Sequence, residues 1–135
     1  MNIDNINKTI EAIRHQRDIG IFFDMGTFFD SNHSCGTSAC IGGFAAILAN
    51  GGTMRVGRDY ESEGREYLGL DPETAGNLFY PGATEYGYEA SADDAIKVLE
   101  HLKATGEADW TIVNVDPQKH WDDAQEYRNN PPVSA

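Results

Sequence analysis

The sequence predicts a single, mostly α-helical domain built around a central helix rich in small residues, and it allows a minor two- or three-stranded β element. Several segments repeat apolar residues at spacings of three and four, and glycines follow them as stops. Few segments alternate apolar and polar residues, as half-buried strands do. With 135 residues, 40% of them hydrophobic, the chain can bury one core without disulfides or metals. We expect a globular domain over 1–128 and a flexible tail over 129–135.

The first helix is predicted over residues 4–18. Its isoleucines recur at spacings of three and four, with Asp4 available as N-cap and Gly20 as a stop. The segment 21–30 that follows contains four phenylalanines, too closely spaced for one helical stripe. We expect it to be either a short buried strand or an irregular segment.

The central helix is predicted over residues 39–50, after turn-forming residues at 31–37. It is apolar on nearly every side, so it should lie in the middle of the domain. Its glycines and alanines would let neighbouring backbones approach closely, which compensates for the ~1 kcal/mol that each helical glycine forfeits relative to alanine. Asn50 and the two glycines after it should end the helix.

Two shorter helices are expected next, followed by a loop. Residues 58–69 can form a polar helix, and Asp71 with Pro72 has the cap and first-position chemistry of another. The buried side of this second helix is predicted to contain Leu70, Leu78, Phe79 and Tyr80. Residues 83–90 are expected to form an exposed loop.

The C-terminal part is predicted to contain two further helices and a strand. Ser91 to Asp94 resembles a capping box and opens a helix that Gly106 ends. Residues 110–115 can form a short strand, and 119–127 a last helix. Its aligned apolar positions are Trp121, Ala124 and Tyr127.

The charge of the chain constrains its partners. With 22 acidic and 10 basic residues the net charge is −12, which disfavours direct contact with nucleic acid or anionic membranes. The same field attracts basic protein surfaces, such as a groove in which another protein holds nucleic acid. Acidity for solubility alone is the alternative explanation. No segment has the ~20 apolar residues that span a bilayer, and residues 1–5 lack the features of a secretory signal, so we expect a cytoplasmic protein.

The segment from Cys35 to Cys40 is the most unusual part of the sequence. A loop is predicted to enter the central helix there, and the free amides of a first helical turn can bind an anion. Simple helix capping by a hydroxyl is the alternative. The candidate ligand-binding residues are Gly36, Thr37, Ser38, Ala39 and Cys40, with Tyr86 or Tyr88 available to stack on a base.

The two cysteines allow further hypotheses. A first-turn position would lower the pKa of Cys40 and favour a thiolate nucleophile. His33, Cys35 and Cys40 offer three soft ligands within eight residues for a zinc ion, although their spacing differs from the usual Cys-x2-Cys. The two thiols could instead form a reversible disulfide, or both could be buried structural groups. We expect buried structural thiols and no cofactor, because free cysteine is among the most buried residue types.

Four segments together form the pattern F-D-M … C-G-T-x-x-C-[IA]-x-G … L-G-L … L-F-x-P. They are Phe23–Phe28, Cys35–Gly43, Leu68–Leu70 and Leu78–Pro81. In this pattern, over residues 3–110, the chain resembles a family of small uncharacterised proteins of bacteriophages and bacteria. The resemblance implies no activity. It implies a phage context, in which small acidic proteins often bind and block a host factor.

We therefore expect a non-enzymatic acidic binding protein, specifically a phage-encoded inhibitor of a host defence or nucleic-acid-handling protein in the bacterial cytoplasm. The first alternative is a binding sponge for a nucleotide signal, and the second is a cysteine- or zinc-dependent enzyme. Self-association through the small-residue helix is also open. The candidate partner-binding residues are Asp59, Glu61, Glu63, Glu66, Asp122 and Asp123.

Overall fold

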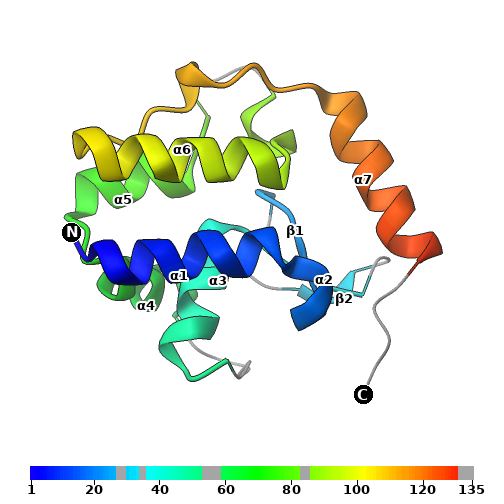
Figure 1. Cartoon of the computed structure of the whole chain (residues 1–135), viewed down its shortest axis with the longest axis horizontal. Coiled ribbons are helices and arrows are strands. Elements are labelled where there is room, and N and C mark those ends of the chain that lie inside the picture. Colours follow the sequence, from blue (N-terminus) through cyan, green and yellow to red (C-terminus); the bar gives the residue numbers. More distant parts are fainter. Residues whose placement is uncertain (27–29, 34–35, 53–58, 83–85, 131–135) are drawn as a thin grey trace.

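The computed structural model describes residues 1–26, 30–33, 36–52, 59–82 and 86–130. Helices predominate among them, which confirms the mostly α prediction (Figure 1). The α-helices are α1 (Ile3–Arg14), α2 (Gln16–Ile19), α3 (Ile41–Ala49), α4 (Tyr60–Leu68), α5 (Pro72–Phe79), α6 (Ala92–Thr105) and α7 (Pro117–Asn129). The 3-10 helices are η1 (Gly87–Glu89) and η2 (Trp110–Ile112).

The β element is a small sheet of three strands. Its strands are β1 (Ile21–Phe23), β2 (Asp30–His33) and β3 (Gly36–Ala39), in the order β1-β3-β2. The central strand, β3, runs parallel to β1 and antiparallel to β2. The segment of closely spaced phenylalanines therefore begins as a buried strand, one of the two alternatives that its sequence allowed.

The first helical segment differs from its prediction in its cap and in its continuity. Asn2, not Asp4, is the N-cap, because its side chain accepts a hydrogen bond from the amide of Asn5 at 3.0 Å. The helix breaks at His15, so the expected helix over 4–18 is two helices, α1 and α2. Gly20 ends α2 in the left-handed conformation, as predicted.

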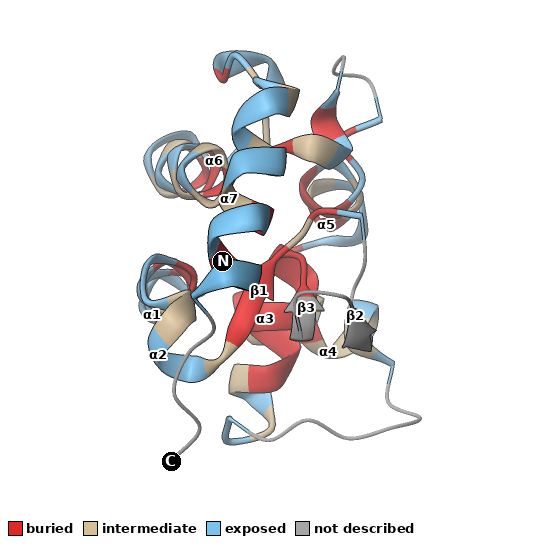
Figure 2. Ribbon diagram, turned by 90° about the vertical axis from the view of Figure 1, so that its right-hand side faces the viewer, coloured by how far each residue is buried: buried red, intermediate tan, exposed pale blue. Residues whose placement is uncertain are grey.

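Helix α3 forms the centre of the core, and each of its residues from Ile41 to Ile47 is buried (Figure 2). Helices α1, α4, α5 and α6 contribute to the same core. The predicted close approach of backbones is present, because Gly64 of α4 faces Gly42 of α3. The helix starts later than expected, since Cys40 has an extended backbone and is its N-cap.

Helix α4 lies within the predicted range 58–69, and α5 and α6 begin at the predicted caps. Asp59 and Asp71 accept the capping hydrogen bonds of α4 and α5, from the amides of Ser62 and Thr74. Ser91 and Asp94 form the reciprocal capping box of α6. The prediction for the buried side of α5 was wrong at one residue, because Tyr80 follows the helix and is 45% exposed.

The predicted strand over 110–115 is wrong, since Trp110–Ile112 is the 3-10 helix η2. The reason is local, because Asp109 accepts a hydrogen bond from the amide of Thr111 and turns the chain. The last helix begins at Pro117, with Asp116 as its cap. Of its aligned apolar residues, Ala124 and Tyr127 are buried and Trp121 is 63% exposed.

Helix α7 packs against the rest of the chain through a small apolar cluster of Phe22, Ala124 and Tyr127, separate from the main core. Figure 1 shows it at one end of the molecule, after an extended connection from η2. The helix continues to Asn129, past the predicted end of the domain at 128, and residues 131–135 of the predicted tail lie outside the described residues. Among the described residues, no helix is long and apolar enough to cross a membrane.

Candidate functional site

The predicted ligand loop has a different local structure from the one that its sequence suggested. Residues Gly36–Ala39 form the central strand β3, not the first turn of a helix. In the sheet register, Ser38 lies opposite Phe22 on one side and Asp30 on the other. The premise that these residues present a row of free helix-terminal amides is therefore wrong.

Cys40 is buried, as expected of a structural thiol, and its surroundings oppose the alternative hypothesis of a thiolate nucleophile. Burial raises the pKa of the Cys40 thiol to about 11, although hydrogen bonding with the backbone of Gly43 and Gly42 acts in the opposite direction. The expectation of a pKa lowered by the helix dipole is therefore wrong, because desolvation is the larger effect. At neutral pH Cys40 is a thiol inside the core.

The proposed zinc ligands are only partly described. Cys35 lies outside the described residues, and for His33 the backbone, in β2, is described without its side chain. Among the side chains that are described, no three histidine, cysteine or carboxylate groups are placed to hold a metal ion.

The two sets of predicted partner-binding acids lie far apart. Those from Asp59 to Glu66 belong to α4 and its cap, whereas Asp122 and Asp123 lie on α7, and Figure 1 shows these helices on opposite sides of the molecule. The structure therefore does not bring the six carboxylates into one surface.

Several of these acids also have partners within the chain. Asp59 accepts hydrogen bonds from the amide and hydroxyl of Ser62, and Glu63 accepts one from the side chain of Asn50 at 2.9 Å. Glu61 accepts a hydrogen bond from the hydroxyl of Tyr80 at 2.8 Å.

On α7, the side chain of Gln118 donates to Asp122 at 3.0 Å, and Lys119 pairs with Asp123 at 3.2 Å. Glu66 of α4 is exposed, and no hydrogen bond or ion pair links its side chain to the residues that the structure describes. These residues consequently differ in how much a partner could use them, and Glu66 is better placed than Asp59 or Asp123.

A groove between α5 and residues 106–111 gathers acidic and aromatic side chains. It consists of two adjoining cavities of about 120 and 280 Å3 that share Asn77, Ala108 and Asp109. The smaller cavity is further lined by Tyr80, Pro81, Trp110 and Thr111, and the larger one by Glu73, Thr74, Gly106 and Glu107. We call this surface the acidic groove.

Charge is unevenly distributed around the acidic groove. Three carboxylates line it, those of Glu73, Glu107 and Asp109, and no lysine or arginine lines it among the described residues. The two segments that supply the lining, 59–82 and 106–111, contain eight carboxylates and a single cation, Arg65. Hydrogen bonds from Thr111 lower the pKa of Asp109, and those from Thr74 lower the pKa of Asp71, the cap of α5. These carboxylates are therefore charged at neutral and mildly acidic pH.

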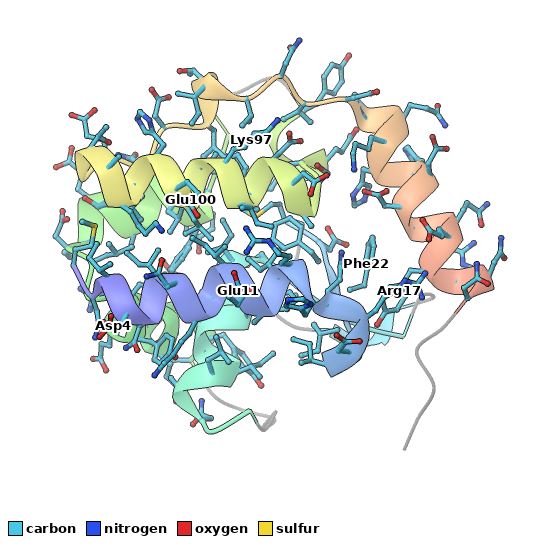
Figure 3. The ribbon with its side chains drawn as sticks, in the orientation of Figure 1. Asp4, Glu11, Arg17, Phe22, Lys97 and Glu100 are labelled. Atoms are coloured by element: carbon cyan, nitrogen blue, oxygen red, sulfur yellow. The ribbon has the colours of Figure 1, made fainter. Side chains whose placement is uncertain are left out.

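The face formed by α1 and α6 has a different charge pattern. Figure 3 shows Glu11 on α1 and both Lys97 and Glu100 on α6, so both signs occur there. Lys103 pairs with Glu100 at 2.9 Å and donates to the side chain of Asn7 at 2.7 Å. Acidity is thus a feature of the groove side and not of every surface.

One exposed tyrosine lines the acidic groove, and two others follow it in the sequence. Tyr80 lines its smaller cavity, and partial burial together with the hydrogen bond to Glu61 raises the pKa of Tyr80 to about 12. Tyr86 and Tyr88 are also exposed, and Tyr86 has a left-handed backbone (φ 59°), uncommon for a residue other than glycine. One or the other was predicted to stack on a ligand held by Gly36–Ala39; neither lines the acidic groove, and the groove residue nearest to them in sequence is Pro81.

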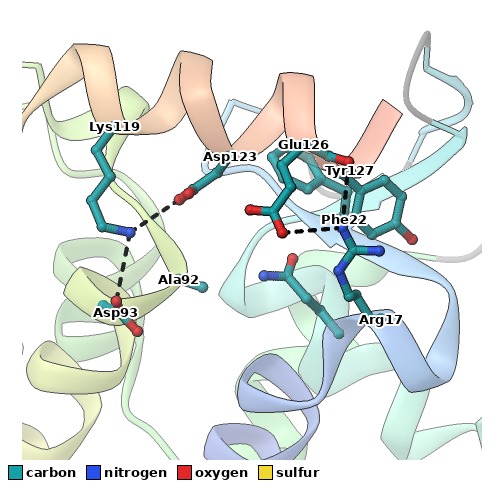
Figure 4. Close-up of a pocket in the computed structure, with 9 residues that line it drawn as sticks. Arg17, Phe22, Ala92, Asp93, Lys119, Asp123, Glu126 and Tyr127 are labelled. Carbon is teal, nitrogen blue, oxygen red and sulfur yellow. Dashed lines mark hydrogen bonds and ion pairs between the residues drawn. The ribbon is translucent and has the colours of Figure 1, made fainter. Parts of the chain in front are cut away.

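A third cavity, of about 200 Å3, lies where α7 meets the body of the protein (Figure 4). Lys119 pairs there with Asp93 at 3.5 Å and with Asp123, and Arg17 pairs with Glu126 at 3.6 Å. The cations of this cavity are therefore already engaged by carboxylates. Its contacts fasten α7 to α2 and to the start of α6.

Sequence reasoning missed most of the groove residues. Glu73, Asn77, Glu107 and Asp109 come from two segments that are distant in sequence, and the expected strand at 110–115 hid the turn that places Trp110. The Asp-x-Thr sequence of residues 109–111, three residues after the helix stop Gly106, was the available signal for that turn.

Comparisons with protein-family models, with curated proteins and with solved structures found no match to the chain.

Proposed function

We propose that the protein is a non-enzymatic binding protein whose acidic groove docks on a basic surface of another protein. The observation that carries this proposal is the lining of the groove, which among the described residues contains three carboxylates, Glu73, Glu107 and Asp109, and no lysine or arginine. Complementary potentials of this kind steer association and select partners.

The groove also has the composition of a protein interface. Tyr80 is half exposed beside Glu61, and aromatic residues flanked by charged ones are typical of contact surfaces that bind proteins. The walls are fixed before any partner arrives, since Trp110 is buried and donates its indole N–H to the carbonyl of Leu78 at 2.9 Å. Such preorganisation reduces the entropy lost on binding.

Inhibition follows if the partner's basic surface is one that holds nucleic acid, because the protein would then compete with the phosphates. This is the sense in which we propose a phage-encoded inhibitor of a host factor. The geometry gives less support to a nucleotide sponge or an enzyme. Gly36–Ala39 is a strand instead of a helix terminus, and the buried thiol of Cys40 is not activated as a nucleophile.

The test uses a fluorescein-labelled peptide of mixed lysine and arginine, whose binding is followed by fluorescence anisotropy at several salt concentrations. Wild-type protein is expected to bind at low salt and to lose affinity as salt rises. The variant Glu73→Gln/Glu107→Gln removes two exposed carboxylates that line the groove, cap no helix and form no ion pair with the residues that the structure describes. It is expected to bind about tenfold more weakly.

The matched control is Asp18→Asn/Asp122→Asn, which makes the same change in net charge on α2 and α7. It is expected to retain affinity within about twofold. Equal weakening by both variants would mean that only net charge matters. That result, or no binding of the peptide to wild-type protein, would contradict the proposal.

A further inference from the structure

We propose that the smaller cavity of the acidic groove, between Tyr80 and Trp110, is an anchor pocket for the guanidinium group of an arginine side chain from the partner. This inference rests on the proposed function and deepens it, because it names the chemical group that the groove selects. Its evidence is the geometry of Asp109, the two rings and the size of the cavity.

Asp109 lines the cavity, and one oxygen atom of its carboxylate is held by the turn. Its Oδ1 accepts hydrogen bonds from the amide of Thr111 at 2.9 Å and from the hydroxyl of Thr111 at 2.6 Å. Its other oxygen, Oδ2, accepts no hydrogen bond from the residues that the structure describes. The turn thus orients the carboxylate and lowers its pKa, while one oxygen remains for an outside donor.

The exposed ring of Tyr80 is suited to a flat cation, and the buried Trp110 is a fixed part of the cavity wall. Trp110 is 4% exposed and fixed by its bond to Leu78, whereas Tyr80 is half exposed at the edge of the cavity. A planar guanidinium can stack on such a ring while it donates in its own plane to a carboxylate. The hydroxyl of Tyr80 donates to Glu61, so a second carboxylate lies at the outer end of the ring.

The size of the cavity indicates whether it can hold the end group of one side chain or a complete small molecule. Pockets that enclose complete small molecules usually have volumes of roughly 300–1,000 Å3. The cavity beside Tyr80 has about 120 Å3, which admits the end group of a side chain and not a nucleotide. The adjoining cavity of about 280 Å3, lined by Glu73 and Glu107, gives the neighbouring residues of the partner a continuous acidic path.

Arginine is favoured over lysine by these features. A lysine ammonium is a compact, strongly hydrated charge, and it gains little from a flat ring and an oriented carboxylate. An arginine has five donors in one plane and is more weakly hydrated, so it can enter a partly apolar cavity. The groove should therefore distinguish two peptides that have the same charge.

The experiment compares two peptides of equal length and charge, one of lysines only and one with a single central arginine. The probe is the indole N–H signal in 15N-labelled protein. The chain has two tryptophans, so the exposed Trp121 on α7 is an internal control. We expect the arginine peptide to bind at least fivefold more tightly and to shift the Trp110 signal without shifting that of Trp121.

Two variants test the roles of the residues. Asp109→Asn retains a carbonyl oxygen for the bonds from Thr111 but removes the charge, and it should abolish the preference for arginine. Tyr80→Ala should do the same, whereas Tyr86→Ala, a matched loss of an exposed tyrosine, should leave the preference intact.

Equal affinity for the two peptides, or an unmoved Trp110 signal, would overturn the anchor pocket while salt-sensitive binding still supports the acidic groove. Failure of both peptides to bind would overturn the proposed function as well. The two proposals can therefore fail separately.

Discussion

Gly64 on α4 lies so close to Gly42 on α3 that a Cβ atom at Gly64 would be 2.5 Å from the carbonyl oxygen of Gly42. Backbone atoms cannot move away as a flexible side chain can, so the missing side chain permits this helix pair. The pair also positions α4, and with it Glu61 and its bond to Tyr80 at the acidic groove.

Gly64→Ala should therefore destabilise the protein, by roughly 1–3 kcal/mol, because overpacking forces α3 and α4 apart. The control is Gly76→Ala on α5, where a Cβ atom would meet nothing within 4 Å. That variant should gain roughly 0.4–1 kcal/mol, since alanine restricts the unfolded chain. Chemical denaturation measures both, and a Gly64→Ala variant as stable as wild type would show that the helices are not in this close contact.

Phe22→Ala should remove the packing of α7 against the protein while the rest of the chain stays folded. The ring of Phe22 lies 5.2 Å from that of Tyr127, in a cluster separate from the main core. The backbone amides of residues 117–129 are expected to lose their protection from hydrogen exchange, while those of α1 and α6 remain protected. The control, Phe44→Ala, removes a main-core residue and should weaken protection everywhere; a similarly uniform effect of Phe22→Ala would argue against a separately packed α7.

Stability should fall between about pH 9 and 11 because of Cys40. Its pKa is raised in the folded state from 9.0 to about 11, so in this range the unfolded chain binds fewer protons than the folded one. The free energy of unfolding then decreases as pH rises, by at most about 3 kcal/mol from this group. Tyr80, whose folded-state pKa is also raised, adds to the loss at higher pH.

Comparison of wild-type protein with Cys40→Ala isolates the contribution of the thiol, because the tyrosines titrate in both. Denaturation from pH 8 to 11 should show a shallower decline in the variant. Parallel curves for the two proteins would mean that Cys40 is not buried as a thiol.

The sequence predicted the elements whose signals are local. Helix α6 was found from its capping box and from Gly106, and α5 from Asp71 and Pro72, because caps and stops act within a few residues. The burial of α3 also followed from its composition, since a helix apolar on every side has no face for solvent.

The errors arose where contacts between distant segments decide the structure. Gly36–Ala39 has turn-forming residues, yet it is the middle strand of a sheet, because β1 and β2 supply its hydrogen-bonding partners from outside. Asn2 replaces Asp4 as the first cap, since the backbone N–H of Asn2 also donates a hydrogen bond to the carbonyl of Leu68 at 2.9 Å. The acidic groove was missed for the same reason, because α5 and residues 106–111 are separated by all of α6.

The most direct test of the account is to map the binding surface with backbone amide signals of 15N-labelled protein during titration with the arginine-containing peptide. The account predicts that the shifts concentrate in residues 73–80 and 106–111 and that they disappear as salt is raised. Shifts centred on α7, over 117–129, or spread evenly over the protein would contradict the assignment of the acidic groove as the binding surface.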